Sequence, residues 1–166
     1  MTDPRPSTAA RPTTVVVEAD GGSRGNPGPA AYGAVLRDAA SGDLLGVAAQ
    51  TIGTATNNVA EYRGLIAGLQ LAASLAPDAR VEVRMDSRLV VEQMAGRWKI
   101  KHPAMRPLAV AARALARQVV SWTWIPREQN KAADTLVNEA LDGKRDTPPP
   151  SLAQRSAVRG DVERLF

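Results

Sequence analysis

The sequence contains no cysteine among its 166 residues. This absence excludes disulfide bonds, thiolate zinc sites and a cysteine nucleophile, and it is typical of proteins from a reducing cytoplasm. No apolar run approaches the roughly 20 residues that a membrane-spanning helix needs, so we expect no membrane association. Residues 1–12 also lack the apolar stretch of a secretory signal. We therefore expect a cytoplasmic protein.

Histidine is represented by His102 alone, which precedes Pro103 and is interpreted as structural rather than catalytic. Neither charge dominates, because 21 Lys and Arg residues stand against 17 Asp and Glu residues, giving a net charge of +4. If several acids share one metal site, the remaining surface is more basic than this total suggests. A basic surface attracts nucleic acid first among polyanions, although the same excess would also serve solubility alone.

Enough apolar sequence is present for one compact core, with 44% hydrophobic residues in a length typical of one domain. The Pro-, Thr- and Ala-rich residues 1–12 are predicted to form a disordered tail. The core-forming pattern covers residues 13–142, and a Pro-containing linker or tail follows over residues 143–166. We expect a monomer with a single folded domain.

Alternation and helical periodicity predict the secondary structure of residues 13–142. β-Branched or alternating runs predict five strands, at residues 13–20, 31–37, 44–52, 80–85 and 119–125. Apolar stripes predict helices at 58–75 and 89–94, another opened by His102-Pro103, and a last one capped by Asn130. This order indicates an α/β fold with a mixed sheet, helices on both faces, and parallel first and fourth strands.

Four carboxylates lie where these elements are expected to begin or end. Asp20 ends the first strand, Asp86 follows the fourth, and Glu61 and Asp134 fall early in the first and last helices. Each stands beside apolar sequence that would bring it toward the core, where an unpaired anion is costly. Because ligands bind at the carboxyl ends of parallel strands, Asp20 and Asp86 are expected side by side. Oxygen-only ligation favours Mg²⁺ or Mn²⁺ over Zn²⁺ and points to metal-assisted chemistry on phosphate.

The sequence around these acids resembles a known family. The segments ADGGSRGNPGPAAYG, TNNVAEYRGL, MDS and NKAADTLVNEAL occur in the order found in type 1 ribonuclease H (ribonuclease HI), which cuts RNA within RNA–DNA hybrids. The resemblance covers residues 13–142 and implies a ribonuclease H-like fold with a five-stranded sheet in the order 3-2-1-4-5. The chain is also similar to the amino-terminal half of actinobacterial proteins that join this domain to a C-terminal phosphatase domain.

The resemblance assigns the chemistry to the four acids. By position, Asp20, Glu61, Asp86 and Asp134 match the family's catalytic, metal-binding residues, which hold two Mg²⁺ or Mn²⁺ ions. Two such ions, roughly 3.5–4 Å apart, activate a water and stabilise the leaving oxygen of an in-line displacement. The expected products carry a 5′-phosphate and a 3′-hydroxyl.

Recognition of RNA requires contacts with the ribose 2′-OH. The Gly-rich loop that begins at Gly21 presents backbone with little side-chain bulk, which would let a ribose come close. Asn26, Asn57 and Asn58 can donate and accept hydrogen bonds in one groove, although Asn58 could instead cap the helix.

A second candidate contact combines aromatic and basic side chains. Trp98, Lys99 and Lys101 suit the phosphates and sugars of the DNA strand. Packing of Trp98 over the core, with the lysines in solvent, is the alternative.

The loop before the last acid departs from many members of the family, which carry a histidine there. This chain has Arg127 and Glu128 instead. Arg127 could stabilise phosphate charge but cannot act as a general base, and Glu128 could assist the outgoing metal.

Two other functions stay open at this point. A hybrid-binding module without catalysis would gain nothing from clustered negative charge, so the four acids argue against it. A DNA-cutting nuclease of the same fold is opposed by the TNN and GNPG segments.

Overall fold

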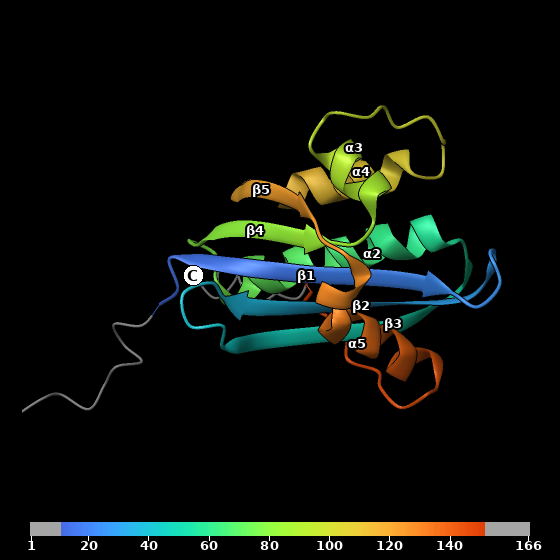
Figure 1. Ribbon diagram of the computed structural model, residues 1–166, viewed down its shortest axis with the longest axis horizontal. Helices are drawn as coiled ribbons and strands as arrows, with labels where there is room; N and C mark the ends of the chain where they lie inside the picture. Colours follow the sequence, from blue (N-terminus) through green and yellow to red (C-terminus); the bar gives the residue numbers. More distant parts are fainter. Residues whose placement is uncertain (1–10, 152–166) are drawn as a thin grey trace, which may run out of the picture.

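The computed structural model describes residues 11–151. Its strands form one mixed sheet in the order β3-β2-β1-β4-β5 (Figure 1). β1 pairs antiparallel with β2 and parallel with β4, so the predicted strand order and the predicted parallel pair are confirmed. The strands are β1 (Thr14–Ser23), β2 (Gly28–Asp38), β3 (Leu44–Ala55), β4 (Arg80–Met85) and β5 (Val119–Trp124).

Helices cover both faces of the sheet, as predicted. They are α2 (Asn57–Leu75), α3 (Arg88–Met94), α4 (Arg106–Leu115) and α5 (Lys131–Leu141), with a short 3₁₀ turn η1 (Arg127–Gln129) before α5. In Figure 1, α2 crosses behind the sheet and α5 lies in front of it. Among residues 11–151, no helix combines the length and the apolarity needed to cross a bilayer.

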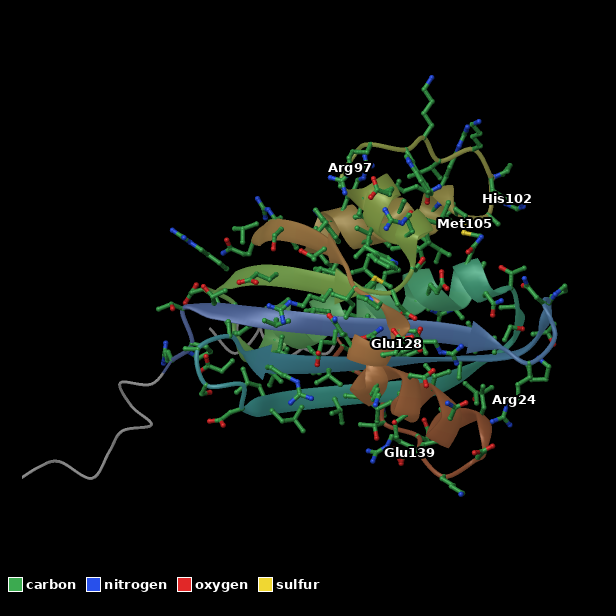
Figure 2. All side chains as sticks on the ribbon, in the orientation of Figure 1. Arg24, Arg97, His102, Met105, Glu128 and Glu139 are labelled. Carbon is green, nitrogen blue, oxygen red and sulfur yellow. The ribbon has the colours of Figure 1, made fainter. Side chains whose placement is uncertain are left out.

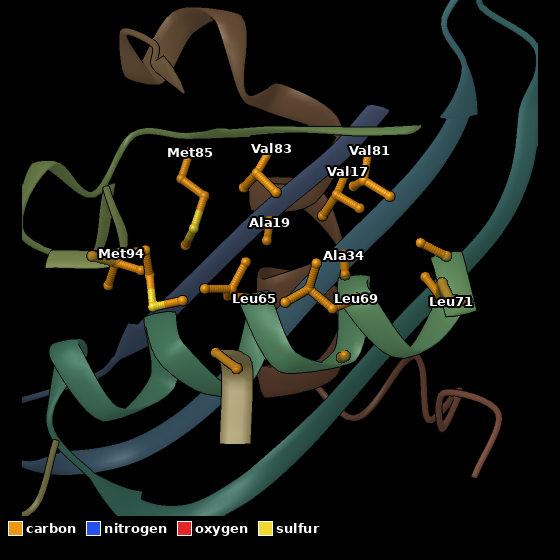
Figure 3. Packing of buried hydrophobic residues seen from close by; sticks show 14 of the residues in the cluster. Val17, Ala19, Ala34, Leu65, Leu69, Leu71, Val81, Val83, Met85 and Met94 are labelled. Atoms are coloured by element: carbon orange, nitrogen blue, oxygen red, sulfur yellow. The ribbon is translucent and has the colours of Figure 1, made fainter. Parts of the chain in front are cut away.

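The larger core lies between the sheet and α2. Leu65 and Leu69 of α2 face Val17 of β1 and Val83 of β4 (Figure 3), and all four side chains are buried. A smaller cluster joins α5 to the opposite face through Leu136 and neighbouring apolar residues. Burial on both faces fixes the register of the central strands, because a slip of one residue would turn every side chain to the wrong face.

Four predicted boundaries differ from the structure by three residues or more. β2 begins at Gly28 rather than at residue 31, β3 ends at Ala55 rather than at residue 52, and the other two concern β1 and α4. β1 continues to Ser23, so Asp20 lies inside the strand, opposite Gly33, rather than at its end. α4 begins at Arg106 rather than at His102-Pro103, with a proline in its first turn. The Nδ1 atom of His102 accepts a hydrogen bond from the Ala104 N–H at 3.1 Å, within the turn that precedes the helix.

The segment that follows α5 returns to the sheet. Thr147 and Ala49 of β3 exchange two backbone hydrogen bonds of 2.8 Å each. The Gln50 amide also donates to the Asp146 carboxylate at 3.0 Å. The predicted linker therefore begins with a stretch that lies along β3. The predicted domain limits remain predictions, and residues 1–10 and 152–166 lie outside the described part of the chain.

Candidate active site

The four predicted acids line one cavity of about 350 Å³. Asp20 comes from the middle of β1, and Asp86 follows β4. Glu61 lies in the second turn of α2, and Asp134 in the first turn of α5. Residues 114 positions apart in the chain, counted from Asp20 to Asp134, thus meet at one edge of the sheet. The expected convergence of the four carboxylates is present.

Glycines set the distance between α2 and β1. A Cβ added to Gly21 would lie 2.1 Å from the Ala60 carbonyl carbon, and one added to Gly64 would lie 2.4 Å from the Asp20 carbonyl oxygen. A side chain at either position would therefore push the helix off the strand. This close approach brings Glu61 to the cavity beside Asp20.

A third glycine has the same effect on the opposite face. A Cβ at Gly33 of β2 would lie 2.5 Å from the Ala133 carbonyl oxygen of α5. Gly33 is also the residue paired with Asp20 across β1 and β2. The absence of a side chain there lets the first turn of α5 lie against the sheet, and this turn carries Asp134 into the cavity.

Two of the carboxyls are held in environments that disfavour their charge. Burial raises the pKa of Asp20 from its ordinary 3.8 to about 8, and the charge of Asp86 and the contact with Asp134 add to this shift. Burial likewise raises the pKa of Glu61 from 4.5 to about 7. A hydrogen bond with Ser87 opposes the Glu61 shift, and the charge of Asp86 adds to it. The protein surroundings therefore supply too little positive charge and too few hydrogen bonds to keep these two carboxyls ionised as readily as in water.

Asp86 is held by two neighbours. The indole Nε1 of Trp124 donates to the Asp86 carbonyl oxygen at 3.1 Å. The Asn130 Nδ2 donates to the Asp86 Oδ1 at 2.9 Å, and also to the Ala19 carbonyl oxygen at 2.9 Å. Asn130 stands at the N-cap position of α5, but its side chain makes no capping hydrogen bond. The prediction that Asn130 caps this helix is therefore wrong for its side chain.

The donor set fits a hard divalent cation. All four candidate ligands are carboxylates, and two of them have pKa values raised by burial and by neighbouring acids. A nearby dication would reverse that effect, because an opposite charge favours the ionised form. Within residues 11–151, no group of three or more acidic or histidine side chains forms a ready-made cation site.

The predicted asparagines connect the glycine-rich loop to α2. Asn26 Oδ1 accepts from the Asn57 N–H at 3.1 Å, and Asn57 Oδ1 accepts from the Ser23 N–H at 2.8 Å. Thr56 rather than Asn58 caps α2, through a hydrogen bond from the Val59 N–H, so the alternative of a capping Asn58 is wrong. Asn57 and Gly21 line the cavity of the four acids, which leaves a role in substrate binding as a prediction.

A second concave surface collects the other predicted substrate residues. Asn58, Trp98, Lys99 and Lys101 line a groove of about 560 Å³ beside α3. Trp98 is 45% exposed, so it is not packed into the core. Figure 2 shows Arg97, His102 and Met105, which also line this groove, together at the α3–α4 end of the molecule, away from Arg24. We call this surface the basic groove.

The loop before α5 places one of its two predicted residues at the cavity. Arg127 lines it, and one guanidinium nitrogen lies 3.6 Å from the Asp134 Oδ1. Glu128 is exposed on η1 and is not among the residues that line the cavity (Figure 2). Arg24, which was not predicted as a site residue, also lines the cavity and pairs with Asp142 at 2.7 Å. A single cation inside a glycine-rich loop was the signal available for it.

Comparison with known proteins identifies the class. A family described as reverse transcriptase-like matches residues 18–140. The Bifunctional protein Rv2228c of Mycobacterium tuberculosis is 58% identical over 153 residues, covering 91% of this chain and 40% of that protein. Ribonuclease HI of Halobacterium salinarum is 48% identical over 125 residues, covering 74% of this chain and 62% of that protein. The chain thus spans 40% and 62% of the length of these two relatives.

Solved structures agree with these matches. The N-terminal ribonuclease H domain of the Mycobacterium tuberculosis protein superposes with a TM-score of 0.75 at 56% identity, covering 80% of this chain and 96% of that one. LC11-RNase H1, solved in complex with an RNA/DNA hybrid, has a TM-score of 0.73 at 40% identity, covering 78% of this chain and 97% of that one. The chain therefore belongs to the ribonuclease H family, as the sequence motifs indicated, and its domain is similar to ribonuclease HI.

Proposed function

We propose that this chain is a metal-dependent endonuclease that hydrolyses the RNA strand of RNA–DNA hybrids and leaves 5′-phosphate and 3′-hydroxyl ends. One observation carries the proposal: four carboxylates from β1, α2, the end of β4 and α5 line a single cavity. Relatives named ribonuclease HI, and the related LC11-RNase H1 solved with an RNA/DNA hybrid, support the choice of substrate.

The acids would hold two Mg²⁺ or Mn²⁺ ions. When bound, these ions supply an activated water at neutral pH and stabilise negative charge on the phosphate and the leaving oxygen. Asp20, which is the most buried of the four acids, would be one of their ligands. Glu61, Asp86 and Asp134, which line the same cavity, would be the other protein ligands. The ions would in turn compensate for burying carboxylates whose charge the protein alone does not neutralise.

The basic side chains would bind the charged phosphates of the substrate and would not act as general bases. Arg127 lines the cavity beside Asp134 and can neutralise phosphate charge, but its guanidinium stays protonated and cannot remove a proton. In the basic groove, Trp98 would stack on the DNA strand while Lys99 and Lys101 pair with its phosphates. Asn57 and the backbone at Gly21 would face the RNA strand at the cavity.

Cleavage of labelled substrates tests the proposal. The RNA–DNA hybrid, duplex RNA and duplex DNA are incubated with Mg²⁺, with Mn²⁺ and with EDTA. We expect cleavage of the hybrid alone, abolished by EDTA and by Asp86→Asn. Asp43→Asn is the matched control, because Asp43 is an exposed acid in the turn between β2 and β3, and it should cut normally.

The other functions are separate outcomes of the same experiment. Equal cutting of duplex DNA would favour a DNA nuclease of this fold. Tight hybrid binding without cutting in any metal would favour a binding module. Cutting that persists in EDTA or in Asp86→Asn would refute the metal assignment.

Assembly and location stay predictions. A C-terminal phosphatase domain joined to this one is part of the proposal, because of the resemblance of the sequence to two-domain actinobacterial proteins. The chain covers 40% of a relative named as bifunctional, which supports a longer parent protein without identifying its second domain. A monomeric state and a cytoplasmic location also belong to it, the latter from the absence of cysteine.

A further inference from the structure

Asn130 has an exposure of 1%, the lowest of the buried polar residues in the described part of the chain, and it contacts Asp86 behind the acid cavity. It lies between the end of η1 and the start of α5. Its Nδ2 donates to the Ala19 carbonyl oxygen and to the Asp86 Oδ1, each at 2.9 Å. Both partners are pure acceptors when Asp86 is ionised, so the reversed amide orientation would set three oxygens against one another. The orientation of the amide is therefore determined by its neighbours.

These contacts connect Asn130 with three of the four acids. Ala19 directly precedes Asp20 in β1, and Asp86 follows β4. The Asp134 N–H donates to the Asn130 carbonyl oxygen at 3.1 Å in the first turn of α5. One residue thus joins β1, the end of β4 and the start of α5 where their carboxylates converge.

We propose that Asn130 is a positioning residue, which fixes the Asp86 carboxylate and the first turn of α5 so that Asp86 and Asp134 are presented to the divalent cations together. The proposal rests on the proposed function for the identity of the cation site. Asn130 itself would touch neither the cations nor the substrate. Outer groups that orient metal-binding side chains in this way change metal affinity or activity by about 10–100-fold when they are removed.

A purely local role does not account for the same observations. The Asn130 side chain makes no capping bond to α5, which is the usual reason for asparagine at this position. Its Oδ1 is buried and has no hydrogen-bond partner among the described residues. Packing or capping alone would not favour a side chain with an unsatisfied buried acceptor. The two donor bonds of the Nδ2 remain as the feature that requires an amide.

Two variants remove these donors in different ways. Asn130→Asp keeps the shape of the side chain but replaces the amide with acceptors, and Asn130→Ala removes the side chain beyond Cβ. Asn130→Ser keeps one donor on a shorter side chain and is a milder change if Asn130→Ala fails to fold. Gln129→Ala is the matched control, because Gln129 is an exposed amide one residue earlier in η1.

Cation binding without substrate is the first measurement. Calorimetric titration with Mn²⁺ should show affinity about 10-fold or more weaker in Asn130→Asp and Asn130→Ala, and unchanged in Gln129→Ala. The second measurement is hybrid cleavage at saturating Mg²⁺. We expect kcat to fall by about 10–100-fold while KM for the hybrid changes less than about 3-fold, because the basic groove is untouched.

The outcomes separate this inference from the proposed function. If the unaltered chain binds Mn²⁺ but cuts no hybrid, the proposed function fails, and weaker Mn²⁺ binding in Asn130→Asp would still support the positioning role. Folded variants with unchanged Mn²⁺ affinity and unchanged kcat would overturn the inference. Loss of folding in all three Asn130 variants would assign the residue to structure alone and would overturn it as well.

Discussion

In the absence of divalent cations, this fold should become less stable as the pH rises from about 5 to about 8. Asp20 is 8% exposed, and its pKa rises from 3.8 to about 8 in the folded chain. Glu61 changes in the same direction, from 4.5 to about 7. Between these values the folded chain binds protons that the unfolded chain has released. The stability that these protons provide is present below about pH 4 and is lost as the pH passes through the folded pKa values.

The size of the effect follows from the Asp20 shift. A change from 3.8 to about 8 corresponds to about 6 kcal/mol between the fully protonated and the fully ionised states. The carboxylates can move apart and water can enter the open cavity, so we expect a measured loss of about 2–4 kcal/mol. Asp20→Asn removes this titration and should make the stability nearly independent of pH above pH 6, apart from the smaller contribution of Glu61.

Urea unfolding in EDTA, repeated at intervals from pH 5 to pH 9, measures this dependence. Asp43→Asn serves again as the exposed-acid control and should follow the unaltered chain. Addition of Mg²⁺ should restore stability at pH 8 far more than at pH 5, because only the ionised carboxylates bind it. Stability that stays constant or increases across this range in EDTA would refute the argument that the acids are buried without a protein counter-charge.

Three further predictions concern the parts that surround the acids. Gly21→Ala should destabilise the fold by about 1–3 kcal/mol in urea unfolding, because its Cβ would lie 2.1 Å from the α2 backbone. Gly22→Ala is the control and should be tolerated, because its Cβ meets only Val137 at 3.6 Å. Equal effects of the two variants would contradict this account. Trp98→Ala should raise KM for the hybrid by about 5–150-fold with little change in kcat, because the variant loses base stacking. An unchanged KM in steady-state assays would show that Trp98 does not contact the substrate. Arg127→Ala should lower kcat by about 3–10-fold, a modest effect because the Arg127 side chain is 75% exposed. Arg127→Lys should recover part of the lost kcat. A changed pH profile would instead indicate that Arg127 orders a titrating group.

The convergence of the acids could be predicted because it depends on regular features of the sequence. Alternation in the strands, helical spacing in α2 and the parallel pairing of β1 with β4 bring Asp20, Glu61 and Asp86 to one edge. The approximate place of Asp20 sufficed for this, although β1 ends at Ser23, three residues later than predicted. The additional pairing arises because Gly21–Ser23 continue the ladder with Ala30–Tyr32 before the chain turns.

Details that depend on contacts distant in sequence could not be predicted. The side chain of Asn130 donates hydrogen bonds to acceptors that lie 44 and 111 residues away in the chain, instead of capping its own helix. Local preference favours asparagine as a helix cap, and two buried acceptors outweigh that preference here. The start of α4 was placed too early for a different reason. Two prolines, Pro103 and Pro107, could each begin a helix, and only the second does.

From the close packing around the acid cavity we infer that bound divalent cations would stabilise the fold in addition to taking part in catalysis. Gly21, Gly33 and Gly64 let two helices approach the sheet more closely than any side chain would allow, and the buried carboxyls of Asp20 and Glu61 lie where these helices meet it. Packing alone would be satisfied by alanines and a wider spacing, which would also relieve the repulsion between the acids. Under the proposed function, the close approach would bring the carboxylates within reach of shared cations. Variants that loosen it should therefore lose cation affinity and cation-induced stabilisation together, and loss of one without the other would separate the two roles.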